Sequence, residues 1–283
     1  MRLSPRTWRF NAAWLGLLLA LPLAAQQRKL AIVNAALLEA EDGFAAPAGT
    51  VFTPGETLYL AFHVQGFTED RSNKVKLGYR IDALDPKGIP FVEPLEGRVD
   101  TELSPQDAKW MPRIRFSASL PPFVDSGTYK FAMHVTDDLG KAQTSQELTF
   151  PVRGRNVPPS DTLVVRNFAF SRQEDGDQLP TPAFRPGDVL WAAFDLTGYK
   201  PGEKHRVAIS YNLAVLNSEG KVIYEQPEPA REEGTSFYPR RYVHAVFSLN
   251  LAQSPAGQYT IVLKTKDEIG SQNHESRHTF TVE

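Results

Sequence analysis

One stretch near the end of the chain matches the pattern of a zinc hydrolase. His274-Glu-Ser-Arg-His278 is H-E-x-x-H, which on a helix places two histidines on one face around a zinc ion, with the glutamate as the base. However, the chain repeats itself, and the matching stretch of the first copy, 144–148, belongs to a predicted strand. In a strand, residues i and i+4 lie about 13 Å apart, which zinc–nitrogen bonds of about 2.1 Å cannot bridge. We therefore expect no zinc site here.

Acidic turns are the second place where a ligand could bind. Calcium needs six to eight oxygen ligands that converge on one point, and no turn has the full ligand spacing. We favour turns in solvent whose aspartates bond their own backbone. No nucleophile elbow, phosphate-binding loop or dinucleotide glycine pattern occurs, so we expect no cofactor, no metal and no catalysis. The acidic turns are Glu41-Asp42, Asp137-Asp138, Glu174-Asp175-Gly-Asp177 and Asp267-Glu268.

Aromatic and arginine residues gather in two connections that precede predicted strands. They read Trp110-Met-Pro-Arg113 and Phe237-Tyr-Pro-Arg-Arg-Tyr242. Aromatic residues and arginine dominate interface hot spots, and loops on a rigid scaffold commonly carry binding. The candidate interaction residues are Trp110, Arg113, Phe237, Tyr238, Arg240 and Arg241, together with Trp191 on a predicted strand.

The same residues also fit a purely structural interpretation. The aromatic side chains would then close the open end of each sandwich, because large apolar side chains are more often buried than exposed. Arg240 and Arg241 would pair with local acids such as Glu232 and Glu233.

Two copies of one strand pattern organise the chain. Each copy has a Pro-Gly turn, then alternating apolar residues, then a Gly-aromatic pair, and the second begins 132 residues after the first. A period of two residues predicts a strand with one buried face. The expected buried residues are Leu58, Leu60, Phe62 and Val64 in the first copy, and Leu190, Ala192, Phe194 and Leu196 in the second.

Other strands follow at intervals of 10 to 20 residues, with no sustained helical period, so we predict an all-β fold. The predicted strands include 29–38, 74–84 and 113–120 in the first copy and 163–170, 207–215 and 244–251 in the second. We expect a short fourth strand around Phe91 and over 222–224, each followed by a long polar connection, 99–112 and 228–239.

A corner motif follows the fifth predicted strand of each copy. Asp125-Ser-Gly-Thr-Tyr129 resembles the tyrosine corner of the immunoglobulin-like sandwich, in which the Tyr hydroxyl bonds back to the corner backbone. Phe131 and Ile261 stand where antibody domains have a cysteine, so an apolar contact replaces the disulfide. The resemblance implies two tandem seven-stranded immunoglobulin-like antiparallel β-sandwiches that arose by internal duplication. It names a fold and carries no activity.

The pattern also predicts the domain limits. Residues 1–25 have a basic start, an apolar run of about 12 residues and small residues before Gln26, as in a secretory signal peptide. Two sandwiches, 26–153 and 162–283, would follow, joined by a linker over 154–161. Pro158-Pro159 stiffens this linker, so we expect a restricted elbow.

Composition narrows the possible partners. The chain has no cysteine, and without residues 1–25 it has 28 basic and 33 acidic residues, a formal charge of −5. A mildly acidic chain is a poor binder of nucleic acid and anionic membranes. After signal cleavage we expect no membrane span, and the sequence leaves the oligomeric state open.

We therefore predict an exported, non-catalytic protein that binds or scaffolds in the periplasm or outside the cell, with a protein or an envelope polysaccharide as partner. A periplasmic chaperone of pilus type is one alternative, which predicts paired basic residues at the elbow near Arg153 and Arg155. A carbohydrate-binding accessory module is another, with Tyr59 and Trp191 as the exposed aromatics.

Overall fold

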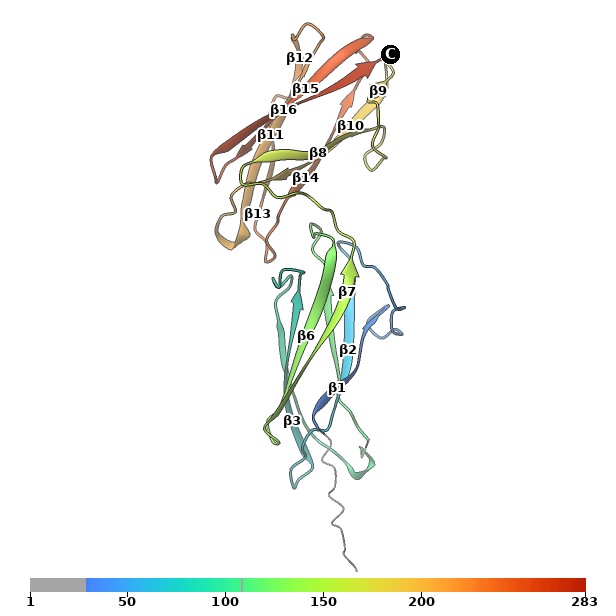
Figure 1. The fold of residues 1–283 in the computed structure, drawn as a ribbon, viewed down its shortest axis with the longest axis vertical. Coiled ribbons are helices and arrows are strands. Elements are labelled where there is room, and N and C mark those ends of the chain that lie inside the picture. The colour runs from blue at the N-terminus through green and yellow to red at the C-terminus, as the bar shows by residue number, and fades with distance from the viewer. Residues whose placement is uncertain (1–28, 108) are drawn as a thin grey trace, which may run out of the picture.

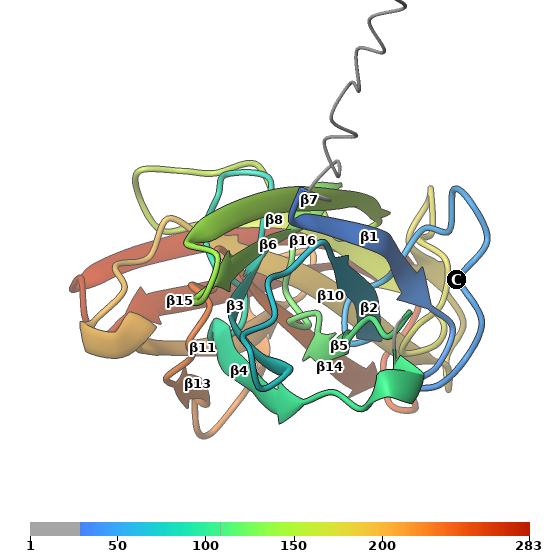
Figure 2. The ribbon, with the colours of Figure 1, turned by 90° about the horizontal axis from the view of Figure 1, so that it is seen from below.

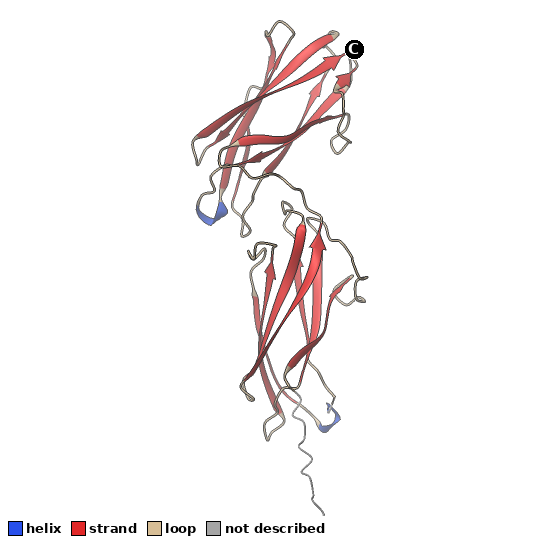
Figure 3. Cartoon of the chain, in the orientation of Figure 1, coloured by secondary structure: helices blue, strands red, loops and turns tan. Residues whose placement is uncertain are grey.

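A computed structural model describes residues 29–107 and 109–283, and the predicted signal peptide lies outside these residues. The described chain is all-β, as predicted, with two single-turn 3₁₀ helices (Figure 3). Its two halves lie end to end along the long axis (Figure 1), and a view along that axis places the strands of one half in front of those of the other (Figure 2). No helix in the described ranges is long and apolar enough to cross a membrane.

The N-terminal half contains seven strands in two sheets. They are β1 (Ala31–Leu38), β2 (Thr57–Gln65), β3 (Lys74–Leu84), β4 (Leu95–Glu102), β5 (Arg113–Ser119), β6 (Gly127–Asp137) and β7 (Ala142–Val152), with the 3₁₀ helix η1 (Pro105–Asp107) before β5. One sheet has the order β1-β2-β5 and the other β4-β3-β6-β7, and all pairs are antiparallel. This division is compatible with an immunoglobulin-like sandwich.

The C-terminal half repeats this plan with additions. Its strands are β8 (Val164–Ser171), β9 (Ala183–Phe184), β10 (Val189–Thr197), β11 (Val207–Leu216), β12 (Val222–Glu225), β13 (Ala230–Gly234), β14 (Val243–Asn250), β15 (Gly257–Asp267) and β16 (Gln272–Val282), with η2 (Glu203–His205) before β11. The sheets are β8-β10-β14 and β12-β11-β15-β16-β9, and β13 also pairs with β11. The short β9 pairs with β16 in parallel.

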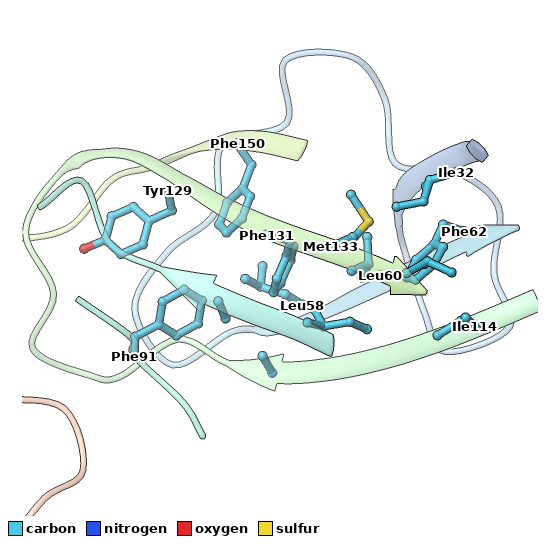
Figure 4. Packing of buried hydrophobic residues seen from close by; sticks show 14 of the residues in the cluster. Ile32, Leu58, Leu60, Phe62, Phe91, Ile114, Tyr129, Phe131, Met133 and Phe150 are labelled. Carbon is cyan, nitrogen blue, oxygen red and sulfur yellow. The ribbon is translucent and has the colours of Figure 1, made fainter. Parts of the chain in front are cut away.

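The strand faces agree with the predicted two-residue period. The eight residues expected inside on β2 and β10 are all buried. Figure 4 shows the core of the N-terminal half, where aromatic rings from β6 and β7 pack against the side chains of β2 and β5. The rings of Phe131 and Phe150 lie 5.2 Å apart between centroids. The alternation therefore sets which face of each sheet meets the core.

Both tyrosine corners form as the resemblance implies. The Tyr129 hydroxyl donates to the carbonyl of Asp125 at 3.0 Å, and the Tyr259 hydroxyl donates to the carbonyl of Pro255 at 2.7 Å. The second corner forms although Pro255 replaces the aspartate, because the acceptor is a backbone oxygen. Phe131 is buried at the position of the missing cysteine.

The prediction for the fourth strand of the first copy was wrong. Phe91 lies outside the strands, and β4 occupies Leu95–Glu102, partly inside the stretch expected to be a polar connection. The strand lies at a sheet edge, and it alternates exposed residues with half-buried ones such as Val99. An edge strand that carries charge resists unwanted pairing, so its sequence resembles a loop. The same reason explains β13 within the second predicted connection.

Two of the four acidic turns use a carboxylate on their own backbone, as favoured, but these carboxylates, Asp137 and Asp267, are buried and not in solvent. Asp42, in another of the turns, pairs with Arg115 at 2.6 Å. Asp137 accepts hydrogen bonds from the N–H groups of Leu139 and Gly140, at 3.0 and 2.9 Å, and from Thr68 at 2.8 Å. Burial acts to raise the pKa of Asp137, but these backbone hydrogen bonds outweigh it and the pKa is lowered. Asp267 holds the equivalent turn of the C-terminal half in the same way.

The H-E-x-x-H stretch lies on β16, as predicted. The half-buried ring of His278 stacks on Phe168, with centroids 3.4 Å apart and planes at 4°, and its Nε2 lies 2.9 Å from the Ser276 hydroxyl. Burial, together with a smaller effect of His274, lowers the pKa of His278 to about 4. The side chain is therefore a neutral packing element of the C-terminal half.

This shift predicts a pH-dependent stability. The unfolded chain binds a proton at His278 near pH 6.5, whereas the folded chain binds it only near pH 4, so the free energy of unfolding should fall as the pH falls through this window and level off below it. His278→Phe keeps a flat ring that cannot be protonated and should flatten this dependence in urea unfolding curves. The exposed His134→Gln variant is the control and should keep it. An unchanged pH profile in His278→Phe would contradict the assignment.

Candidate functional site at the junction of the two halves

The strongest concentration of buried polar groups lies where the two halves meet. The loop that precedes β14 reaches from the C-terminal half onto the end of the N-terminal half. Its Tyr238 is buried and belongs to the hydrophobic core of the N-terminal half. The Tyr238 hydroxyl donates to Asp85 Oδ2 at 2.9 Å. One half thus completes the core of the other.

Arg241, in the same loop, is held by two acids of the N-terminal half. Its Nη1 lies 2.7 Å from Asp125 Oδ2, its Nη2 contacts the fully buried Asp85 Oδ2, and its guanidinium lies 5.8 Å from the centre of the Tyr238 ring. Burial acts to lower the pKa of Arg241, but Tyr238 and the two acids outweigh it, so the pKa is raised. The arginine is charged and paired, which a largely buried cation requires.

Asp85 performs two tasks with its two oxygens. Oδ1 closes its own turn by accepting the N–H groups of Lys87 and Ile89, both at 2.8 Å, which leaves Oδ2 for Tyr238 and Arg241. The equivalent residue of the C-terminal half is Asn217, whose Oδ1 closes the same turn. A carboxylate is therefore not needed for the turn, and the junction is what uses its second oxygen.

Aromatic side chains surround these ion pairs. The rings of Phe123 and Tyr242 meet edge to face with centroids 5.7 Å apart, and the guanidinium of Arg240 lies 5.3 Å from the centre of the Phe123 ring. Arg240 also pairs with Glu232 at 2.6 Å, as the structural interpretation expected. Glu233 pairs instead with Arg206, and Arg241 leaves its own half.

The linker is fixed on both sides. The N–H of Arg155 donates to the carbonyl of Val124 in the N-terminal half at 3.1 Å. Its side chain reaches the C-terminal half, where Nε lies 3.0 Å from the fully buried Asp195 Oδ2. Asp195 is also held by Asn167 and by His244 Nδ1, both at 2.8 Å. The elbow is therefore restricted by direct bonds as well as by its two prolines.

The predicted interaction residues lie in three separate places. Tyr238, Arg240 and Arg241 form the junction, and Phe237 beside them is 48% exposed at the rim of a hollow of about 240 Å³. Trp110 lies at the opposite end of the N-terminal half, edge to face with Phe67 at 5.8 Å. The exposed Arg113 begins β5 at that same end, and Trp191 is half-buried on β10.

Sequence reasoning missed the acidic side of the junction. Asp85, Asp125 and Asp195 are the acids that hold the two arginines, and none was among the predicted interaction residues. A signal was available, because the equivalent residues in the other copy are neutral or only weakly basic, namely Asn217, Pro255 and His63. A charge present in one copy alone has a task that the shared fold does not explain.

The ionisable groups of the junction are suited to a structural role. Its carboxylates are paired with arginines. Burial, above all, raises the pKa of Tyr129 and of Tyr242 to about 12, so both hydroxyls stay protonated at neutral pH. A group tuned for acid–base catalysis is shifted towards the working pH, and these tyrosines are shifted away from it.

Comparisons with known proteins give structural matches only. No protein-family model and no curated protein matches the chain. Among solved structures, the C-terminal domain of the Streptococcus pyogenes antigen I/II-family protein AspA matches at 9% identity and a TM-score of 0.32, with 90% of this chain and 99% of that chain covered. The C-terminal domain of the Streptococcus agalactiae AgI/II polypeptide BspA matches at 12% identity and a TM-score of 0.31, with 88% and 98% covered.

Exchanging one carboxylate oxygen of Asp85 for an amide nitrogen tests its role. Asp85→Asn should keep its turn, as Asn217 does, but lose the charge that holds Arg241, and a hydrogen bond to a charged group contributes about 1.5 to 3 kcal/mol. We expect the free energy of unfolding to fall by about that amount in urea titrations. Asn217→Asp makes the reverse exchange at the equivalent exposed turn and should change it by less than about 0.5 kcal/mol. Equal effects of the two variants would show that Asp85 acts only within its turn.

Proposed function

We propose that this protein is an exported, non-catalytic scaffold that holds two immunoglobulin-like modules, 26–153 and 162–283, in one fixed orientation and presents binding surfaces along the resulting rod. The observation that supports this most is the junction. Modules joined by a linker move relative to one another unless their interface holds them. Here the C-terminal module places Tyr238 and Arg241 into the end of its neighbour.

Three groups of contacts hold the two modules together. Arg241 bonds Asp125 and Asp85 across the interface. Arg155 anchors the linker to Asp195. Phe123 packs against Tyr242. Moving one partner of a buried ion pair away leaves an uncompensated charge, which costs several kcal/mol. A change of the angle between the modules is therefore energetically unfavourable.

The ionisable groups support a role without catalysis. The groups with shifted pKa values are engaged in structural contacts: Asp137 holds a turn, Tyr129 a corner, and Arg241 the junction. His278 of the H-E-x-x-H stretch packs on Phe168. Shifted groups that converge in an open cleft would favour an enzyme. Tyr129, Tyr238 and Arg241 do meet at the junction, but their polar atoms are engaged there by Asp85 and Asp125, and Asp137 and His278 belong to other contacts.

The two alternative functions fit less well. A pilus-type chaperone needs paired basic residues at the elbow that are free to grip a client. Arg155 is paired with Asp195 of the chain itself, which leaves only the exposed Arg153 of the expected pair for that role. A carbohydrate-binding module needs a row of exposed aromatics, but Tyr59 and Trp191 are half-buried and belong to different halves. Among the predicted interaction residues, Phe237 beside the junction is an exposed aromatic that could contact a protein or polysaccharide partner.

A distance measurement between the modules tests the proposal. Because the chain has no cysteine, Gln146→Cys and Asn273→Cys, both at exposed positions, place one spin label on each module. We expect a single narrow distance distribution in pulsed electron resonance. Arg155→Gln combined with Arg241→Gln should broaden it, whereas Arg206→Gln, which removes an ion pair inside one module, should not.

Two results would overturn the proposal. A broad distribution in the otherwise unchanged chain would show that the modules move freely, and no fixed scaffold would remain. Steady turnover of an ester, peptide or glycoside substrate by the purified chain would show that it is an enzyme.

A further inference from the structure

The strand β12 is an unusual edge. It lies at the end of the C-terminal half that is remote from the junction (Figure 1) and forms one margin of its sheet. Its side chains are apolar yet uncovered, since Val222, Ile223 and Tyr224 are 50%, 49% and 45% exposed. An exposed apolar edge strand is a template for pairing with another strand.

Two comparable edge strands, β13 and β4, carry charged residues. On the same margin of the sheet, β13 reads Ala-Arg-Glu-Glu-Gly, and the edge strand β4 of the N-terminal half reads Leu-Glu-Gly-Arg-Val-Asp-Thr-Glu. Charged residues in such positions prevent strands from adding to the sheet. In β12, only Glu225 is charged among four residues. The edge strand β1 is apolar too, but all except one of its side chains are buried or half-buried, whereas all four of β12 are exposed.

In the N-terminal half, the position equivalent to Ile223 is buried. Phe91 occupies the position of Ile223, counted from Gly88 and Gly220 of the preceding turns. Phe91 is only 2% exposed and, with Tyr238 of the C-terminal half, belongs to the core cluster of the N-terminal half. At the remote end of the rod, Ile223 is uncovered, and the register of β12 on β11 passes over it as the extra residue of a bulge.

We infer that β12 pairs with β12 of a second copy of this chain, in antiparallel register with Ile223 opposite Ile223. The sequence Lys221-Val-Ile-Tyr-Glu225 is complementary to itself in this register. Lys221 stands opposite Glu225, and Val222 opposite Tyr224, twice each because the pairing is symmetric. Cross-strand pairs of opposite charge, and aromatic pairs with β-branched residues, both stabilise antiparallel strands. A two-fold interface of this kind is the commonest in homo-oligomers.

Head-to-tail stacking of copies is a weaker match to the same end. It would place the loop that carries Tyr238 and Arg241 on the remote end of another rod, as it lies on the N-terminal half. The remote end has Asn217 and Pro255 where the junction has Asp85 and Asp125, so both carboxylates that hold Arg241 at the junction are missing there. Arg241 is also already paired within its own chain. Pairing between two β12 strands does not depend on these acids, because residues 221–225 are complementary to themselves.

A short strand pair makes a weak dimer. Only five residues face each other, so we expect a monomer at low concentration that associates reversibly as the concentration rises. Sedimentation measurements on the complete mature chain should show this. Ile223→Lys places a charge in the centre of the pairing and should abolish association, whereas Val189→Lys, at a similarly exposed position on β10, should leave it unchanged.

The register itself is tested by charge reversal. Lys221→Glu places glutamate opposite Glu225 twice, and Glu225→Lys places lysine opposite Lys221 twice, so each variant alone should associate at least about tenfold more weakly. A mixture of the two restores opposite charges at both positions and should form a mixed dimer. Association of the unmixed variants at full strength, no recovery in the mixture, or a chain that stays monomeric at millimolar concentration would each overturn the inference.

Discussion

The position of Arg241 between the buried Asp85 and the half-buried Asp125 is the constraint on which the arrangement of the molecule depends. A buried arginine is tolerable only when it is paired, and both of its partners, Asp85 and Asp125, belong to the other half of the chain. The C-terminal half therefore reaches its lowest energy only against the end of its neighbour. Tyr238 follows the same logic, since its ring fills the neighbour's core and its hydroxyl reaches the same carboxylate.

The two halves share one strand plan, and small differences between them distinguish their ends. Asp85 and Asn217 close the same turn, yet only the aspartate has a second acceptor oxygen free for a partner. Trp110 packs on Phe67 at the outer end of the first copy, whereas the connection before β14 supplies the arginines of the junction. A shared fold tolerates these changes because they lie in turns and connections, outside the alternating core residues.

The sequence predicted the parts of the fold that depend on local pattern. The two-residue period placed Leu58 and Phe62 inside, and the repeat placed His278 on a strand. The edge strand β4 was missed because its charged alternation resembles a loop. The acids of the junction were missed because pairing across two halves has no local signature, and an aspartate in a turn has an adequate local explanation. A residue-by-residue comparison of the two copies would have pointed to these acids, because each is present in one copy only.

The linker has a mechanical consequence. Arg155 bonds the N-terminal half through its backbone and the C-terminal half through its side chain, immediately before the stiff Pro158-Pro159 segment. Under tension along the long axis, these bonds and the Arg241 ion pairs would bear the force in parallel with the covalent chain of the linker. The linker could not straighten until they ruptured, so a moderate pull would be transmitted from one sandwich to the other without extension of the elbow.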